Sequence, residues 1–162
     1  MNKNIYKNKI NYFVINRSKQ WTKRIPKIKH LIDLILDYPQ YFIDKKYQMN
    51  EITFLLTDDV GIKKFNSKFR KKPFSTDILT FTSNQKLHNN KIIRLCDIVL
   101  SVDYIKKDVL RLKKNFYFHL THLIIHGLFH YNGYTHNTIK EEKKMQNLEQ
   151  KILNKLNAKK LF

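Results

Sequence analysis

The chain contains few cysteine, glycine, proline and acidic residues. Among 162 residues there are one cysteine, three glycines and three prolines. The single cysteine, Cys96, excludes an intramolecular disulfide and leaves a metal site without an obvious thiolate partner. Only 13 Asp and Glu stand against 32 Lys and Arg, which gives a net charge of +19. This charge favours a polyanionic partner such as RNA, although the same excess of Lys is typical of proteins from A/T-rich genomes.

A long apolar run is also absent. No stretch of about 18 uncharged apolar residues occurs, and no apolar segment follows the basic N-terminus. The sequence therefore predicts neither a membrane span nor a secretory signal, and we expect a cytoplasmic protein. Hydrophobic residues nevertheless make up 42% of the chain and aromatic residues 13%, which supports a packed core. We expect residues 1–162 to form a single domain.

The densest group of chemically active side chains lies between His126 and His136. His126 and His130 are four residues apart, so on a helix both imidazoles lie on one face, with Cβ atoms about 5–6 Å apart. Gly133 follows where such a helix must end, because glycine can adopt the left-handed conformation of a C-terminal cap. The turn can then bring His136 to the same point. Three imidazoles with an open fourth position are typical of a catalytic zinc site, so we predict one Zn²⁺ ion per chain.

Two alternatives to this ligand set remain open. His122 is also four residues before His126 and forms a rival pair, and a histidine pair on an apolar helix is more often packing than a metal site. The third histidine after the glycine turn favours the metal site. The spacing His-x3-His-x2-Gly-x2-His is also that of metzincin peptidases, but Gly127 stands where their general-base glutamate would be. A peptidase here would lack its base.

Hydrophobic periodicity predicts an α+β fold, with a small mixed four-stranded sheet packed against about five helices and the histidine pair on a zincin-like helix. The expected strands span 9–15, 51–56, 77–82 and 97–102. The expected helices span about 26–38, 60–70, 103–112, 116–132 and 138–156. The polar stretch 83–91 is predicted to be a loop. Thr57-Asp58-Asp59 and Asp103 are predicted to cap helices, and Thr138 with Glu141 has the form of a capping box.

A basic run, Arg70-Lys71-Lys72, ends the helix expected over 60–70. These cations favour a helix C-terminus, so they can simply stabilise the helix and lie in water. Alternatively, Arg70 clamps a phosphate, because the planar guanidinium matches phosphate oxygens in pairs.

The motif His-Gly-x-x-His-x-x-Gly-Tyr-x-His, residues 126–136, resembles the signature of the YbeY family. Members of that family are bacterial metal-dependent endoribonucleases specific for single strands and implicated in rRNA maturation and ribosome quality control. Further blocks resemble the family in order from about residue 50. These blocks are Leu56-Thr57-Asp58-Asp59 with Phe65-Asn66, Phe69-Arg70 with Thr76-Asp77-Ile78-Leu79-Thr80-Phe81, Asp97-Ile98-Val99-Leu100-Ser101, and Met145-x3-Glu149-x2-Ile152-Leu153.

The resemblance implies a metal-dependent endoribonuclease acting in 3′ end maturation of small-subunit rRNA and late ribosome quality control. It implies Arg70 and His126 as catalytic residues, His126, His130 and His136 as zinc ligands, and Arg70, Lys71 and Lys72 as the residues that bind substrate. The partners implied are single-stranded RNA, rRNA and ribosomal particles, with neither DNA nor a membrane expected. A zinc hydrolase of peptides or amides and a non-catalytic ribosome-binding module remain as other functions.

Two features of the chemistry stay open in the sequence. No general base is assigned, because Asp77 and Asp97 are candidates by residue type alone and the 2′-hydroxyl of the substrate is an alternative nucleophile. The chain also departs from the family at Thr135, where Asp is usual, at Cys96, where Gly is usual, and at Ser75, where Pro is usual. Loss of the carboxylate at 135 predicts weaker metal affinity, because carboxylates near metal ligands support them.

Overall fold

The fold is built on a mixed sheet of four strands. The computed structural model describes residues 10–43, 47, 49–88 and 90–157. The strands are ordered β1 (Ile10–Asn16), β2 (Met49–Thr57), β4 (Ile92–Ser101) and β3 (Ile78–Lys86) across the sheet. β1, β2 and β4 run parallel, whereas β3 is antiparallel to β4 and forms one edge. The α+β class and the mixed four-stranded sheet predicted from the sequence are confirmed.

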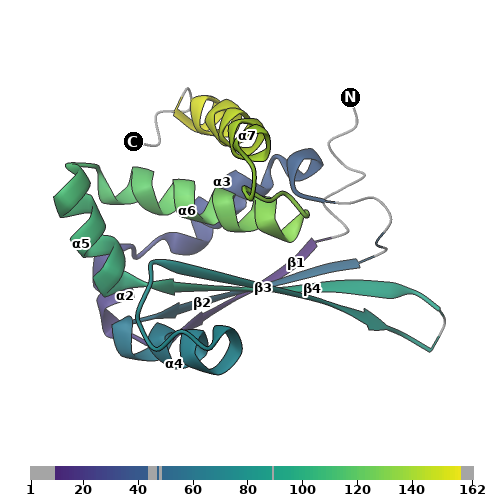
Figure 1. The fold of residues 1–162 in the computed structure, drawn as a ribbon, viewed down its shortest axis with the longest axis horizontal. Helices are drawn as coiled ribbons and strands as arrows, with labels where there is room; N and C mark the ends of the chain where they lie inside the picture. The colour runs from purple at the N-terminus through teal and green to yellow at the C-terminus, as the bar shows by residue number, and fades with distance from the viewer. Residues whose placement is uncertain (1–9, 44–46, 48, 89, 158–162) are drawn as a thin grey trace.

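Helices cover the two faces of the sheet unequally (Figure 1). Four of them lie on one face, and α4 lies alone on the other. Those four are α3 (Ile28–Leu36), α5 (Val102–Leu112), α6 (Phe116–Tyr131) and α7 (Ile139–Asn157), and α4 spans Asp59–Arg70. Within the residues that the structure describes, no helix combines the length and the apolar character needed to cross a bilayer.

The side chains of each strand alternate between the two faces, which divides the core into two clusters. On β4, Cys96, Ile98 and Leu100 belong to the large cluster that includes α6. Val99, between them, packs in a small cluster with Ile62 of α4. A residue of β4 can therefore be assigned to the α6 face or the α4 face from its position alone.

One helix was not expected from the sequence. It is α2 (Lys19–Arg24), which brings the α-helices of the described residues to six, and a 3₁₀ turn, η1 (Pro39–Tyr41), follows α3. The six residues of α2 are too few to show a helical period. The element is held instead by Trp21, which is buried and donates its indole N–H to the carbonyl oxygen of Thr57 at 2.8 Å.

The first four residues of the stretch 83–91 are strand and not the predicted loop. β3 continues to Lys86 and β4 begins at Ile92, with Ser83 opposite Leu95 and Lys86 opposite Ile92. Residues 83–86 are polar and exposed, so they carry no apolar signal, and backbone pairing alone holds them in the sheet. The prediction of a loop is wrong for these residues.

The helix caps agree with the sequence at two helices and differ at a third. Asp58 caps α4 by accepting from the Gly61 N–H at 2.8 Å, and Thr138 Oγ1 accepts from the Glu141 N–H at 3.2 Å, as predicted. The predicted cap at Asp103 is wrong. Ser101 caps α5, with Oγ 3.3 Å from the Tyr104 nitrogen, because the chain turns from β4 into α5 two residues earlier than the pattern indicates.

Candidate metal centre and cleft

Helix α6 carries the histidine pair, and the turn after it delivers the third histidine. Asn115 caps the start of α6 by accepting from the Phe118 N–H at 3.2 Å. Gly133 ends the turn at φ 86°, and its N–H donates to the His130 carbonyl oxygen at 3.0 Å. A Cβ at Gly133 would meet nothing within 4 Å, so the backbone conformation and not crowding requires glycine there. The predicted helix end at Gly133 is confirmed.

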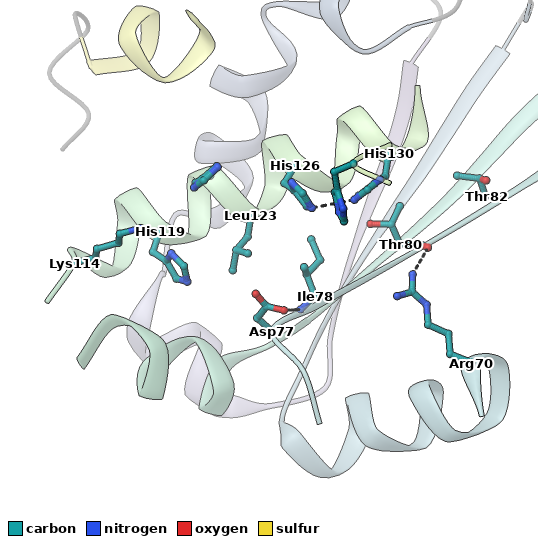
Figure 2. Close-up of a pocket in the computed structure, with 12 residues that line it drawn as sticks. Arg70, Asp77, Ile78, Thr80, Thr82, Lys114, His119, Leu123, His126 and His130 are labelled. Atoms are coloured by element: carbon teal, nitrogen blue, oxygen red, sulfur yellow. Dashed lines mark hydrogen bonds between the residues drawn. The ribbon is translucent and has the colours of Figure 1, made fainter. Parts of the chain in front are cut away.

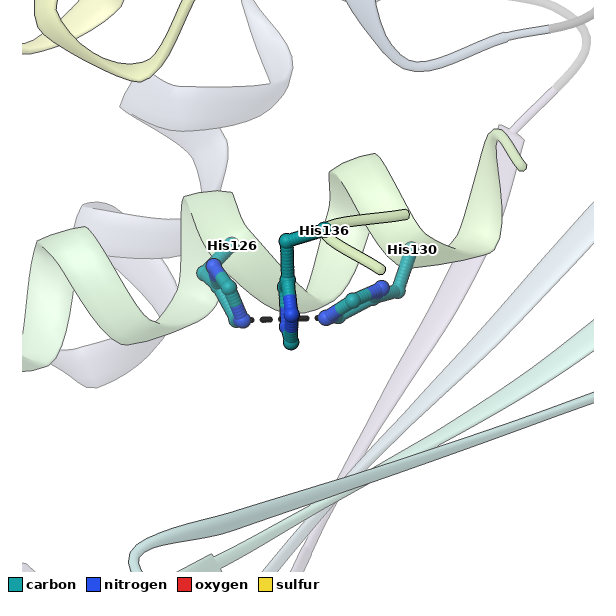
Figure 3. Close-up of side chains that lie close together, drawn as sticks. All are labelled: His126, His130 and His136. Carbon is teal, nitrogen blue, oxygen red and sulfur yellow. Dashed lines mark hydrogen bonds between the residues drawn. The ribbon is translucent and has the colours of Figure 1, made fainter. Parts of the chain in front are cut away.

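The side chains of His126, His130 and His136 converge beyond this turn (Figure 3). One nitrogen from each ring lies within 4.8 Å of the other two. The Nε2 atoms of His126 and His130 are 2.9 Å apart. His126 and His130 are half-buried and His136 is exposed. The structure thus contains a histidine triad that could bind a metal ion.

The hydrogen bonds of the other ring nitrogens decide how this pair of Nε2 atoms is protonated. His126 Nδ1 lies 2.8 Å from Glu149 Oε1, and His130 Nδ1 lies 3.0 Å from the Tyr134 carbonyl oxygen. Ionised carboxylate and carbonyl oxygens only accept, so each Nδ1 must carry the hydrogen. In the neutral rings both Nε2 atoms then present lone pairs to each other, which repel unless a cation lies between them. The donor set therefore fits a metal ion, which binds neutral imidazole.

Glu149 contacts two of the histidines, and sequence analysis assigned it no role although it stands in the closing block that resembles the family. It is 4% exposed, and its two oxygens lie 2.9 Å from His122 Nε2 and 2.8 Å from His126 Nδ1. Burial raises the pKa of this carboxyl, but the hydrogen bonds from His122 and His126 outweigh burial and lower the pKa to about 2. The available signal was an acid within the apolar stripe of α7, between the buried Met145 and Ile152.

His122, the rival ligand, therefore points its Nε2 at Glu149 and not at the other rings. Among the described residues, the group of side chains able to hold a metal ion consists of His126, His130 and His136. Cys96 lies elsewhere, 2% exposed in the core, where burial raises the pKa of its thiol far above the usual range.

The triad opens into a cleft of about 580 Å³ between α6 and β3 (Figure 2). Arg70 lines this cleft from the end of α4, and its Nη2 donates to the Thr80 carbonyl oxygen at 3.3 Å. Lys71 and Lys72 do not line it. Lys71 has the left-handed conformation that ends α4, and its ammonium donates to the Lys68 carbonyl oxygen at 3.3 Å. The structure thus places Arg70 in the same cleft as the histidines but leaves both lysines outside it.

The two aspartates considered as general bases lie on different faces of the sheet. Asp77 lines the cleft, and its Oδ1 accepts from the Ile78 N–H at 2.7 Å and from the Thr76 hydroxyl at 2.9 Å. Asp97 alternates with Cys96 and Ile98 along β4, so its side chain is exposed on the α4 face. Only Asp77 is on the histidine side of the sheet.

Gly127 marks the closest approach of α6 to the sheet. A Cβ built at this position would lie 3.0 Å from Ile78 Cδ1 and 3.0 Å from Thr80 Oγ1. A larger side chain at 127 would therefore press on β3. The absence of the metzincin glutamate at this position has a packing reason.

Comparison with known proteins agrees with these motifs. The sequence model of the family described as Endoribonuclease YbeY matches residues 14–157. The chain belongs to the YbeY family. The resemblance found in the sequence is confirmed.

Relatives in the YbeY family cover most of the chain. Endoribonuclease YbeY of Buchnera aphidicola subsp. Acyrthosiphon pisum (strain APS) is 40% identical over 121 residues, which are 75% of this chain and 77% of that protein. The protein of the same name from Buchnera aphidicola subsp. Schizaphis graminum (strain Sg) is 35% identical over 148 residues, 91% of this chain and 90% of that protein. The solution structure of TM1509 from Thermotoga maritima covers 92% of this chain and 93% of its own, with a TM-score of 0.55 at 18% identity. That likeness shows a shared fold.

Proposed function

We propose that residues 1–162 act as a single metal-dependent endoribonuclease domain that cleaves single-stranded RNA. The observation that carries the proposal is the 2.9 Å distance between the Nε2 atoms of His126 and His130, in the cleft lined by Arg70. The family name of the relatives supports RNA as the substrate, and the net charge of +19 is compatible with it.

His126, His130 and His136 would hold the metal ion, for which we propose Zn²⁺. When bound, such an ion supplies an acidified water and polarises a phosphoryl oxygen. Glu149 and the Tyr134 carbonyl oxygen fix the rings of His126 and His130 by holding each Nδ1–H. These contacts keep both Nε2 atoms unprotonated and aimed at one point.

Arg70 is the residue that we propose holds the scissile phosphate. Its guanidinium has five N–H donors, and one of them is used by the Thr80 carbonyl oxygen. The remaining donors can pair with phosphate oxygens and offset the charge that gathers on them in the transition state. Lys71 and Lys72 would attract the RNA strand outside the cleft.

Analysis of bound metal together with RNA cleavage tests this function. Purified protein should contain one zinc ion per chain, cut single-stranded RNA, spare duplex RNA and stop when a chelator is added. His130→Ala should remove the stoichiometric metal. If His122→Ala removes the metal instead and His136→Ala retains it, the ligand set is wrong. Cleavage of casein but not RNA would establish a peptidase, although this chain has Gly127, packed closely against β3, where such a peptidase has its glutamate.

The chemistry of the cut ends distinguishes the two possible nucleophiles. If water attacks the phosphate held by Arg70, the nucleotide at the cut keeps its free 2′-hydroxyl. Attack by the 2′-hydroxyl of the substrate leaves a 2′,3′-cyclic phosphate. Mass spectrometry of the short products separates these outcomes without assigning a general base beforehand.

The biological setting that we propose is 3′ end maturation of small-subunit rRNA and late quality control of ribosomal particles in the cytoplasm. The family resemblance and the basic charge support this setting. A cell that carries only the Arg70→Ala protein should accumulate unprocessed small-subunit rRNA. If a folded variant that lacks the histidine ligands keeps its cellular role, the protein would be a non-catalytic ribosome-binding module.

A further inference from the structure

The cleft continues beyond the histidine triad along α6. Figure 2 shows Lys114 and His119 toward one end, with Asp77 and Leu123 next to them, and Arg70 toward the other end. His119 precedes His126 by two helical turns, which correspond to about 10 Å along the helix. The far end is therefore distant enough from the metal ligands to hold a different part of a substrate.

His119 is the unusual side chain of this far end. Its side chain is 8% exposed, and both of its ring nitrogens are buried without a hydrogen-bond partner. The nearest acidic oxygen, Asp108 Oδ2, is 3.9 Å from Nε2, beyond hydrogen-bond distance. His122, His126 and His130 on the same helix all have ring-nitrogen partners. A buried polar group without a partner destabilises a protein, so His119 is suited to gain one from a ligand.

The charges differ between the two ends of the cleft. The triad end combines Arg70 with a site for a cation, which suits a phosphate. The far end combines the ammonium of Lys114 and the carboxylate of Asp77 with an imidazole whose pKa is lowered by burial and by Lys114, against the opposing effects of Asp108 and Asp77. These groups offer hydrogen-bond donors and acceptors with little net charge, which suits an uncharged polar ligand better than a second phosphate.

The wall between the ends is apolar. Leu123 and Ile78 line the cleft there, from α6 and β3 respectively. A flat ring can lie against such a wall while its edge meets the polar groups. A second metal site is less suited to this place, because the one group of possible metal ligands among the described residues is the triad.

We propose that the far end of the cleft is a nucleobase subsite that accepts guanine from a nucleotide next to the cleaved bond. This inference rests on the proposed endoribonuclease function. Guanine fits best because its O6 and N7 can both accept from Lys114. Its N1–H or N2–H₂ then donates to Asp77 Oδ2, since Asp77 Oδ1 already accepts from the Ile78 N–H and the Thr76 hydroxyl. Both ring nitrogens of His119 are buried. The imidazole must therefore rotate about Cβ–Cγ when the base enters, so that one nitrogen can form a hydrogen bond with the nucleoside.

Mapping cleavage sites in defined RNAs tests the subsite. The substrates are single-stranded RNAs of equal length that contain uridine throughout, except for one G, A, C or U at successive positions. Wild-type protein with metal should cut at a fixed distance from G about tenfold faster than at the same distance from A, C or U, the discrimination of one bidentate base contact. Lys114→Gln and His119→Phe should reduce this preference severalfold while uridine-only RNA is still cut. Asp77→Asn should lower the rate at G relative to A, because it replaces an acceptor with a donor.

Lys143→Gln is the matched control, because Lys143 is an exposed lysine of α7 outside the cleft. It should keep the full preference. RNA cleavage without base preference, or a preference that all three cleft variants keep, would overturn the inference and leave the proposed function intact. An absence of any RNA cleavage would overturn the proposed function. Titration with guanosine and with cytidine, followed through the ring-proton NMR signals of His119, tests the subsite without cleavage, and equal responses to both nucleosides would count against it.

Discussion

The position of one hydrogen atom on His126 links Glu149 to the metal centre. Glu149 stays ionised, with a pKa of about 2, and holds the Nδ1–H of His126 at 2.8 Å. We expect Glu149→Gln to weaken zinc binding by about 10–100-fold, the usual effect of losing a partner of a ligating histidine. Competition titration with a zinc indicator measures it. Glu142→Gln, an exposed change on the same helix, should bind zinc as wild type does, and equal affinity in both variants would show that Glu149 only packs.

Arg70 should act on substrate and contribute little to stability. It is exposed, and its recorded contacts are a 3.3 Å hydrogen bond to the Thr80 carbonyl oxygen and a position over the Phe81 ring. We expect Arg70→Ala to change the free energy of unfolding by no more than about 0.5 kcal/mol while RNA cleavage falls heavily. Thermal melting and initial rates are the measurements. Arg17→Ala, beside the opposite edge strand, should retain activity, and a large loss of stability in Arg70→Ala with normal activity would make Arg70 structural.

At the residue scale, local spacing was enough to predict what one helix and one turn bring together. The convergence of His126, His130 and His136 depends on a four-residue interval and on Gly133, both of which are local. Glu149 could not be predicted in the same way, because it reaches His126 from α7, 23 residues away. Side chains that meet only through the packing of two elements leave no spacing signal.

Among the elements, the contact between α6 and β3 determines the width of the cleft. An added Cβ at position 127 would lie 3.0 Å from Ile78 Cδ1 and Thr80 Oγ1, closer than an ordinary van der Waals contact. We expect Gly127→Leu to destabilise the protein by about 1–3 kcal/mol through overpacking and to reduce cleavage by moving α6 away from β3. Chemical denaturation without metal measures the stability. Asn147→Leu, on an exposed face of α7, should change it by less than about 0.5 kcal/mol, and equal effects of both substitutions would contradict the close packing.

The elements that sequence analysis placed correctly have an apolar period, and those that it missed do not. β2 and α6 are rich in buried residues, so their patterns were clear. Residues 83–86 of β3 are polar and exposed, and α2 has six residues with one buried side chain, Trp21. Pairing with β4 and burial of one indole ring stabilise these elements, and neither interaction is periodic in the sequence.

For the whole molecule, the basic charge predicts how RNA affinity depends on salt concentration. If single-stranded RNA lies along the cleft, the logarithm of affinity should fall against the logarithm of salt concentration with a slope of about −0.7 per phosphate contacted. Arg70→Ala should make the slope shallower by about one contact, whereas Lys143→Ala should leave it unchanged. Fluorescence anisotropy with chelated protein provides the slopes while the RNA stays intact. Equal slopes for both variants would mean that the charge of +19 acts diffusely and not through this site.

The order of strands was beyond sequence analysis. The residue pattern of each strand predicts the strand but not the strands that pair with it. β4 pairs with β2 and β3, and nothing in the sequence of β4 indicates this. The order matters because it makes β3 the edge of the sheet and so places the cleft, which β3 lines together with α6, at the margin of the molecule.

A site at the edge of a sheet can receive a polymer from the side. Among the described strands none lies beyond β3, so a strand of RNA need not be threaded by an end to reach His126 and Arg70. A covalently closed circle of single-stranded RNA should therefore be opened about as fast as the linear molecule of the same sequence, as gel electrophoresis would show by conversion of circles to full-length linear RNA. Circles that resist while linear RNA is shortened from a terminus would mean that the cleft engages free ends.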